Sequence, residues 1–185
     1  MSRSNRVIQS PFCTLADGRR VLQCHSRGDR RFSPFCCYVE AFGRRDSIEN
    51  HYQRAKVFEG NRVPRDWKEA KIWKKNRLKQ IAWQIGPFRL PCTHNQEKSS
   101  FDLSDLGIQF YIGLWHKYLL ANTRLITLAS QFDEFEDPFK ASFPFCQADV
   151  IRQCVHKGIK SLRPMYAELH LLLKQRRFSP ATSNR

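Results

Sequence analysis

One short segment of the chain groups residues that can do acid–base and nucleophilic chemistry. If residues 46–56 form a helix, Glu49, Gln53 and Lys56 recur at i, i+4 and i+7 and share one face. This face would hold a carboxyl, an amide and an amine in a row. Glu49 could act as a general acid or base, and Lys56 could bind phosphate or form a covalent adduct with a sugar aldehyde. We take Glu49 and Lys56 as the candidate catalytic residues.

Each of these residues also has a purely structural explanation. Glu49 stands three positions after Asp46, the spacing of a helix-capping box, and Lys56 could be a solvated surface lysine. For the catalytic alternative we expect Arg30, Arg31 and Arg45, together with the helix start, to lower the pKa of Glu49. An ionised Glu49 would stabilise an oxocarbenium-like centre or activate a water.

Two other segments hold groups that could complete a site. The run Arg30-Arg31-Phe32-Ser33-Pro34-Phe35 mixes guanidinium and aromatic side chains, which can bind a phosphate and stack a base. The same run could instead be a loop that tucks its phenylalanines into the core. The acidic segment 133–137 offers Asp133 and Asp137 as a second carboxylate facing Glu49, since glycosyl chemistry often uses two acids. Its alternative role is a charge-balancing loop or a helix cap.

The net charge of +15, with a pI of about 9.9, favours a polyanionic partner. DNA is the first expectation, ahead of RNA, and an anionic membrane surface is a weaker one. The candidate nucleic-acid contacts include four lysines that recur along one predicted helix and three arginines. They are Lys68, Lys71, Lys75, Lys79, Arg30, Arg44 and Arg45. A lysine-rich helix face can also be merely solvated, so the spacing leaves both roles open.

These residues need elements to position them, and the pattern predicts an α+β, mainly α-helical single domain with a few short N-terminal strands. The expected helices are 47–58, 66–83, 104–130 with a break at Asn122-Thr123, 147–158, and a last one from Arg163. We expect residues 1–10 to be a flexible N-terminus and 11–173 to be the domain, with a loop insertion at 86–104. Residues 174–185 read as a basic flexible tail.

The seven cysteines are irregularly spaced and match no common zinc site, so we expect free thiols and neither a metal nor a cofactor. No apolar run approaches about 20 residues, and no run of signal-peptide type stands at the N-terminus. From this we expect a soluble, cytoplasmic protein that does not bind a membrane.

The segment Ser47-Ile48-Glu49-Asn50-His51-Tyr52-Gln53-Arg54-Ala55-Lys56 resembles the signature helix of the NADAR family. Phe32-Ser33-Pro34-Phe35 is similar to the segment that precedes that helix, and residues 110–122 look like a later family helix. The resemblance spans roughly residues 29–137. The family's glycine-rich Trp-Gly motif is replaced here by residues 143–149, so we expect a different substrate or an altered activity.

The resemblance implies an N-glycosidase, or a hydrolase that removes ADP-ribose from guanine bases in DNA. It implies that Glu49 is essential, that Tyr52, Gln53 and Lys56 shape a sugar-phosphate site, and that Trp115 forms a pocket wall. We expect a hydrolase acting at an N-glycosidic bond or on a modified guanine. Arg31 would bind the backbone of the nucleic acid, and Phe32 or Trp115 would stack a base. The alternatives are a non-catalytic DNA- or RNA-binding subunit of a larger complex and a 7-deazaguanine-type base-modifying enzyme.

Overall fold

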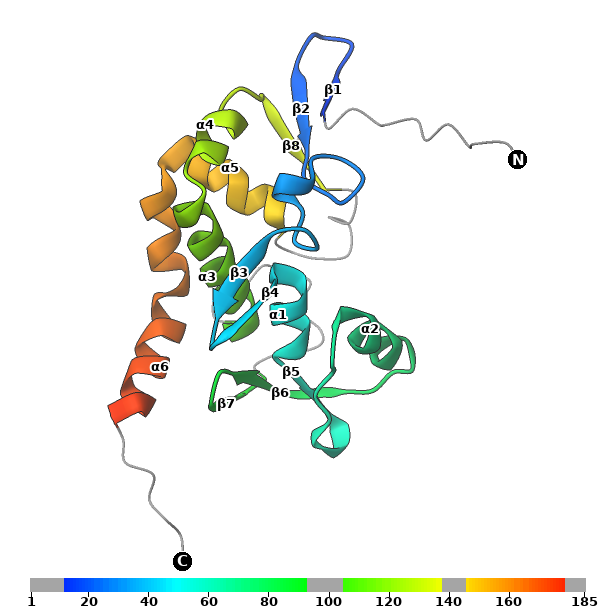
Figure 1. The fold of residues 1–185 in the computed structure, drawn as a ribbon, viewed down its shortest axis with the longest axis vertical. Helices are drawn as coiled ribbons and strands as arrows, with labels where there is room; N and C mark the ends of the chain where they lie inside the picture. Colours follow the sequence, from blue (N-terminus) through cyan, green and yellow to red (C-terminus); the bar gives the residue numbers. More distant parts are fainter. Residues whose placement is uncertain (1–11, 93–104, 138–145, 179–185) are drawn as a thin grey trace, which may run out of the picture.

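The computed structural model describes residues 12–92, 105–137 and 146–178, and it has the mainly helical α+β architecture that the sequence predicts (Figure 1). Its helices are α1 (Ile48–Arg54), α2 (Trp67–Lys75), α3 (Leu106–Ala121), α4 (Arg124–Ala129), α5 (Gln147–Lys157) and α6 (Ala167–Phe178). Its 3-10 segments are η1 (Arg30–Phe32), η2 (Glu59–Asn61) and η4 (Ile159–Tyr166). No helix in these ranges combines the length and the apolar character that a membrane span requires.

The strands of the described residues form three small sheets. The strands are β1 (Phe12–Thr14), β2 (Arg20–Gln23), β3 (Tyr38–Ala41), β4 (Arg44–Ser47), β5 (Lys56–Phe58), β6 (Gln80–Ile85), β7 (Phe88–Pro91) and β8 (Glu134–Glu136). In the first sheet β2 pairs antiparallel with β1 and parallel with β8. The second sheet is the β3–β4 hairpin, and the third is the antiparallel order β5-β6-β7. Strands therefore extend well beyond the N-terminal part to which the sequence pattern confined them.

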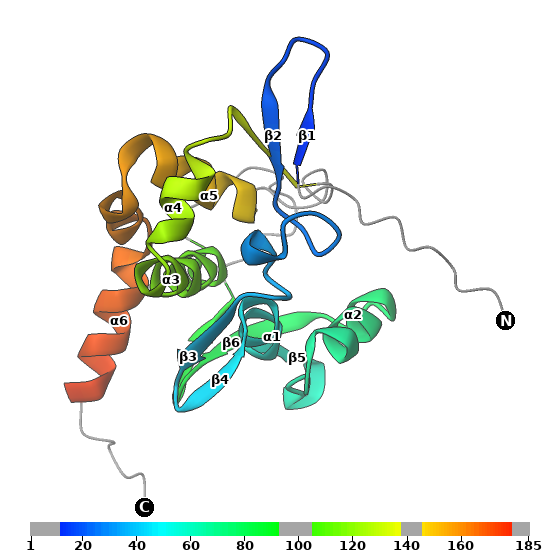
Figure 2. The ribbon, with the colours of Figure 1, turned by 45° about the horizontal axis from the view of Figure 1, so that its top comes forward.

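Helix α3 is the centre of the molecule, and most of its residues are buried. Figures 1 and 2 both show it between the helices α4 to α6 and the region of α1 and the β3–β4 hairpin. Its one buried amide, Gln109, ties α3 to α6 because its Oε1 accepts from the backbone N–H of Leu169 at 2.8 Å and its Nε2 donates to Glu168 at 3.0 Å. The hydrogen bonds fix α6 against a helix that is otherwise apolar on nearly every side.

The first turn of α3 fits against Trp83 because residue 107 is a glycine. A Cβ on Gly107 would lie 2.0 Å from Cζ2 of the buried Trp83 ring. We expect Gly107→Ala to lower the free energy of unfolding by about 2 kcal/mol, since this overpacking forces the ring or the helix to shift. The matched control is Gly113→Ala in the same helix, where a Cβ would meet only Tyr166 at 3.9 Å. It should raise stability by about 0.5–1 kcal/mol. Urea denaturation measures both, and a stable Gly107→Ala variant would contradict this packing.

Several expected element boundaries are wrong. The first helix ends at Arg54, so Lys56 belongs to β5, and the second helix ends at Lys75, so residues 80–85 form strand β6. The expected loop insertion at 86–104 begins with strand β7, while residues 93–104 lie outside the described residues. The break at Asn122-Thr123 and the helix after Gln147 are confirmed. Helix α6 continues through Phe178, past the expected end of the domain at 173.

Candidate functional site

The N-terminus of α1 is capped by a residue other than Glu49. Ser47 is the N-cap, and its Oγ accepts from the backbone N–H of Asn50 at 3.2 Å. Asp46 instead accepts from the backbone N–H of Ser47 at 2.9 Å and from Nδ2 of Asn50 at 2.9 Å. The capping box between Asp46 and Glu49 is therefore wrong, and the carboxyl of Glu49 is available for another purpose.

Glu49 and Gln53 meet on one face of α1, as their spacing predicts. Nε2 of Gln53 donates to Oε1 of Glu49 at 2.8 Å. Burial raises the pKa of Glu49, although Gln53 and Lys56 oppose this effect. The expected lowering by arginines is therefore wrong, because the loss of hydration outweighs every favourable partner of the carboxylate.

Lys56 reaches the same place from strand β5. Its Nζ lies 4.5 Å from the centre of the Tyr52 ring and 5.9 Å from that of Trp83. Burial lowers the pKa of Lys56 to about 8, with Glu49 acting in the opposite direction and the positive charge of Lys74 adding to the lowering. The amine and the carboxyl are thus electrostatically coupled, and both are held in an apolar, aromatic setting that disfavours charge.

Only one of the two expected second carboxylates lies near Glu49. Asp137, at the end of β8, is buried and its charge raises the pKa of Glu49. Asp133 is exposed, and its Oδ2 accepts from the backbone N–H of Arg20 at 2.8 Å, so it supports the pairing of β2 with β8. Asp133 is therefore engaged in the sheet, whereas Asp137 is close enough to Glu49 for its charge to act on it, and ligand contact by either residue stays a prediction.

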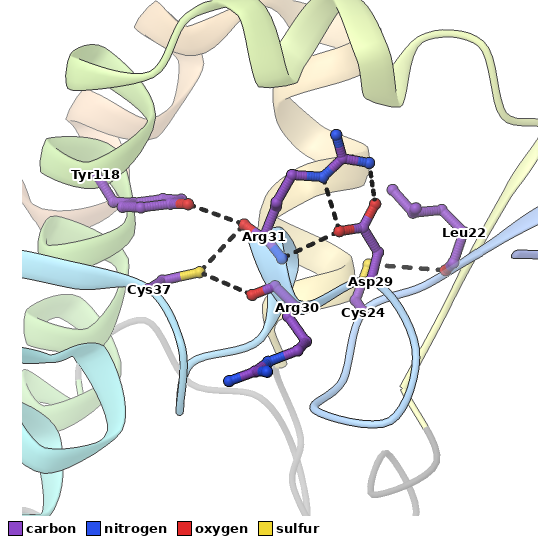
Figure 3. Close-up of polar contacts among 7 residues, drawn as sticks. All are labelled: Leu22, Cys24, Asp29, Arg30, Arg31, Cys37 and Tyr118. Atoms are coloured by element: carbon purple, nitrogen blue, oxygen red, sulfur yellow. Dashed lines mark hydrogen bonds and ion pairs between the residues drawn. The ribbon is translucent and has the colours of Figure 1, made fainter. Parts of the chain in front are cut away.

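Arg31, in the run before α1, anchors the fold. Nε and one terminal nitrogen of Arg31 bind the buried Asp29 at 2.9 Å and 2.6 Å. The backbone carbonyl of Arg31 accepts from the Tyr118 hydroxyl at 3.0 Å and from Sγ of Cys37 at 3.1 Å (Figure 3). Arg31 is therefore committed to Asp29, which makes it a poor phosphate ligand.

Three further expected contacts are buried in the core. Phe32, Ser33 and Trp115 each have no exposed surface. Phe32 and Trp115 cannot stack a base in this structure because both belong to the hydrophobic core, and the side chain of Ser33 is buried as well. For Phe32 the core alternative is confirmed.

The basic side chains gather on α2 and the strand that follows it. Lys68, Lys71 and Lys75 are exposed on α2, and Lys79 is exposed just before β6, so the stripe is only partly helical. Arg45 is exposed on β4. Arg30 is exposed too, and its Nε donates to Sγ of Cys36 at 3.4 Å. These residues are free of carboxylate ion pairs within the part of the chain that the structure describes.

The structure adds residues that the sequence pattern does not single out. The hydroxyl of Tyr111 donates to Gln147 at 3.2 Å, and the charge of Glu49 acts on that hydroxyl. The rings of Tyr52 and Tyr111 lie 5.3 Å apart. Near the start of α2, half-buried Phe35 and Trp67 form an edge-on pair with ring centres 5.1 Å apart. Tyr111 could have been found from its place on the predicted core helix, but nothing in the sequence pairs Phe35 with Trp67.

No three metal-binding side chains gather among the described residues. Comparison of the chain with known proteins finds no matching family model and no matching curated protein. The site consists of Glu49, Gln53, Lys56, Tyr52 and Tyr111, with Asp137 close to the carboxyl of Glu49. We call this group the Glu49–Lys56 site.

Proposed function

We propose that this protein is a hydrolase of NADAR type that acts at an N-glycosidic bond, with a nucleotide or a modified guanine in nucleic acid as its substrate. The observation that carries the proposal is that a half-buried carboxyl and a half-buried amine lie close enough to act on each other, with the pKa of Glu49 raised and that of Lys56 lowered to about 8. Groups whose pKa values move toward neutrality suit proton transfer at physiological pH.

Glu49 is the proposed proton-transfer residue. In hydrolysis the bond from C1′ to the base nitrogen breaks, its electron pair stays on the nitrogen, and water adds its oxygen to C1′. Protonated Glu49 would give a proton to the departing base, and the ionised form would stabilise positive charge at the sugar. The negative charge of Asp137 favours the protonated form of Glu49. The carboxylate of Asp137 would take the proton of the attacking water.

Lys56 has two proposed roles that depend on its protonation. With a pKa of about 8, most of its population is cationic at pH 7 and can hold a phosphate. Roughly one molecule in ten would carry the neutral amine at that pH, which can attack the aldehyde of an opened sugar. Both roles place Lys56 on the sugar-phosphate part of the substrate, while Glu49 serves the glycosidic bond.

A polyanionic substrate is proposed from the charge near the site. Lys74 acts electrostatically on Lys56, so the basic α2 approaches the Glu49–Lys56 site. The pair of Phe35 and Trp67 takes the base-stacking role that buried Phe32 and Trp115 cannot fill. We propose DNA as the partner ahead of RNA, and the cytoplasm as the location.

Charge reversal on α2 tests the nucleic-acid partner. We expect Lys71→Glu with Lys75→Glu to weaken binding of a single-stranded DNA oligonucleotide about tenfold and to reduce the slope of log K against log salt by about 1–2. The matched control is Lys157→Glu with Lys160→Glu, which changes two exposed lysines, one at the end of α5 and one at the start of η4. Each double variant lowers the net charge from +15 by 4 to +11. Fluorescence anisotropy measures both, and equal weakening would mean that only net charge matters.

A non-catalytic nucleic-acid-binding subunit is the second candidate, and the unpaired lysines on α2 favour it. The two candidates differ in one experiment. The protein is incubated with a DNA oligonucleotide that carries ADP-ribosylated guanine and, in a second reaction, with free nucleotides. The products are separated by mass. Release of ADP-ribose or of free base supports the hydrolase, whereas tight binding without release supports the binding subunit.

A further inference from the structure

A cavity of about 180 Å³ lies on the side of α1 that faces away from Glu49. His51, Arg54 and Ala55 of α1 line it, and these residues are turned by more than about 100° from Glu49 around the helix. The other walls come from the β3–β4 hairpin, from Gln84 and Gly86 at the end of β6, and from Phe110 of α3. One buried water needs only about 10–15 Å³ on this measure, so the cavity accepts a much larger group.

The rim of the cavity is positively charged. Arg44 and Arg54 both line it. Arg44 is paired with Asp46, whose Oδ2 accepts from Nε at 3.0 Å, but Arg54 donates only to the backbone carbonyl of Arg65 at 2.6 Å among the described residues. Nε2 of His51 lies 3.1 Å from the carbonyl of Val39, so this nitrogen donates and Nδ1 is left as the second polar atom of the ring. The two guanidinium groups of Arg44 and Arg54 outnumber the one carboxylate, that of Asp46. The rim therefore keeps a net positive charge, which favours an anion.

The opposite wall is aromatic, and the backbone is strained to place it there. Phe42 has a φ of +53° in the two-residue turn between β3 and β4, a position where Asn or Gly is preferred. Its ring is half exposed, with its centre 6.2 Å from that of Phe110. The ring lies over Gly86, where a Cβ would come within 2.5 Å of it. A left-handed phenylalanine is costly and gains only partial burial, so the fold alone does not account for it.

We propose that this cavity is a second ligand site, which binds a phosphorylated aromatic group of nucleoside monophosphate type. The phosphate would lie between Arg44 and Arg54, which can form charge-assisted hydrogen bonds to it. The base would stack on the exposed face of Phe42. The site is independent of the Glu49–Lys56 site and of the proposed hydrolysis there. Its ligand could be a free nucleotide or one nucleotide of a strand, since both carry the same chemistry.

The test is titration of the full-length protein with guanosine 5′-monophosphate, guanosine and inorganic phosphate, followed by amide shifts in NMR spectra. We expect the monophosphate to move the signals of Gly43 and Gly86 and to bind at least about tenfold tighter than guanosine or phosphate alone. A short single-stranded oligonucleotide in the same titration tells a strand from a free nucleotide. Tighter binding of the strand would assign the site to nucleic acid, and tighter binding of the monophosphate would assign it to free nucleotides.

Phe42→Asn is the decisive variant because Asn suits the turn and the fold should remain intact. We expect it to weaken binding of the monophosphate about tenfold, and Arg54→Gln to do the same. The matched control is Tyr38→Asn, which removes an exposed aromatic of the same hairpin that does not line the cavity. It should leave affinity unchanged. Undiminished binding in Phe42→Asn, no binding by the wild type at millimolar ligand, or shifts confined to Glu49 and Lys56 would each overturn the proposal.

Discussion

Glu49→Gln is expected to slow release of the base by about 10²–10⁴-fold and to leave DNA affinity unchanged. The variant keeps the shape of the side chain. In the wild type Nε2 of Gln53 donates to Oε1 of Glu49 at 2.8 Å, and the amide oxygen of the variant can accept the same hydrogen bond. The substitution replaces the carboxyl by an amide, so the side chain at position 49 can no longer give or take a proton. The raised pKa of Glu49 means that ionisation of this half-buried carboxyl costs free energy in the fold. We therefore expect the free energy of unfolding at pH 7 to stay within about 1 kcal/mol of the wild type.

The control for this variant is Asp133→Asn, the same carboxyl-to-amide change at an acid that lies outside the site. Its oxygen can still accept from the backbone N–H of Arg20, so stability and turnover should both be unchanged. Release of ADP-ribose from an oligonucleotide with ADP-ribosylated guanine measures the rate, and urea denaturation measures stability. A Glu49→Gln enzyme within threefold of wild-type turnover, or a loss of turnover explained by unfolding, would remove Glu49 from the mechanism.

Lys56→Met is expected to abolish turnover and to raise the free energy of unfolding at pH 7 by about 2 kcal/mol. At about 1.4 kcal/mol per pH unit, lowering the pKa of Lys56 from 10.5 to about 8 corresponds to about 3 kcal/mol. About 1 kcal/mol of that gain is lost with the contact between the ammonium and the Tyr52 ring, 4.5 Å apart. A trade of stability for activity of this kind is common at active sites, and it agrees with the catalytic role proposed for Lys56.

The pH dependence of Lys56→Met checks the sign of this effect. The pKa of Lys56 is lower in the folded chain, so the unfolded chain binds more protons between about pH 8 and pH 10.5. The destabilisation is complete below that window and disappears as pH rises through it. The stability advantage of Lys56→Met over the wild type should therefore shrink as pH rises from about 8 and be gone by about pH 10.5. The matched control, Lys71→Met, removes an exposed lysine of α2 whose charge is not among those that shift the pKa of Lys56, and it should change stability by less than about 0.5 kcal/mol at any pH. A destabilised Lys56→Met, or curves that stay parallel, would contradict the burial of the amine.

Local sequence patterns predict the parts of this molecule that depend on helix periodicity. The spacing of Glu49 and Gln53 correctly places them on one face, where they form a hydrogen bond. The break after α3 follows from Asn122-Thr123, and α5 follows from the apolar positions after Gln147. In each case the signal and its consequence lie within a few turns of the same helix.

The remainder depends on contacts between distant segments. The run Ile81-Ala82-Trp83-Gln84-Ile85 continues a helical pattern from α2, but pairing with β5 and β7 makes it a strand. Tertiary pairing overrides local preference there. The sequence suggests Arg31 as a phosphate ligand, but in the fold its guanidinium binds Asp29. The pairing of β8 with β2 decides which of Asp133 and Asp137 lies near Glu49. The expected lowering of the pKa of Glu49 fails for the same reason, because the spacing of charges in the sequence does not show how far the carboxyl is removed from water.

The coupling of Glu49 to Lys56 is tested most directly by the pKa of Lys56 itself. Lysine labelled with ¹³C at Cε is titrated by NMR in the wild type and in Glu49→Gln, and Lys56→Met assigns the signal. We expect the wild-type pKa to be about 8 and that of Glu49→Gln to be lower, because the carboxylate favours the charged amine. An ordinary value near 10.5 in both proteins would mean that the two groups do not form one buried site, and the hydrolase proposal would lose its foundation.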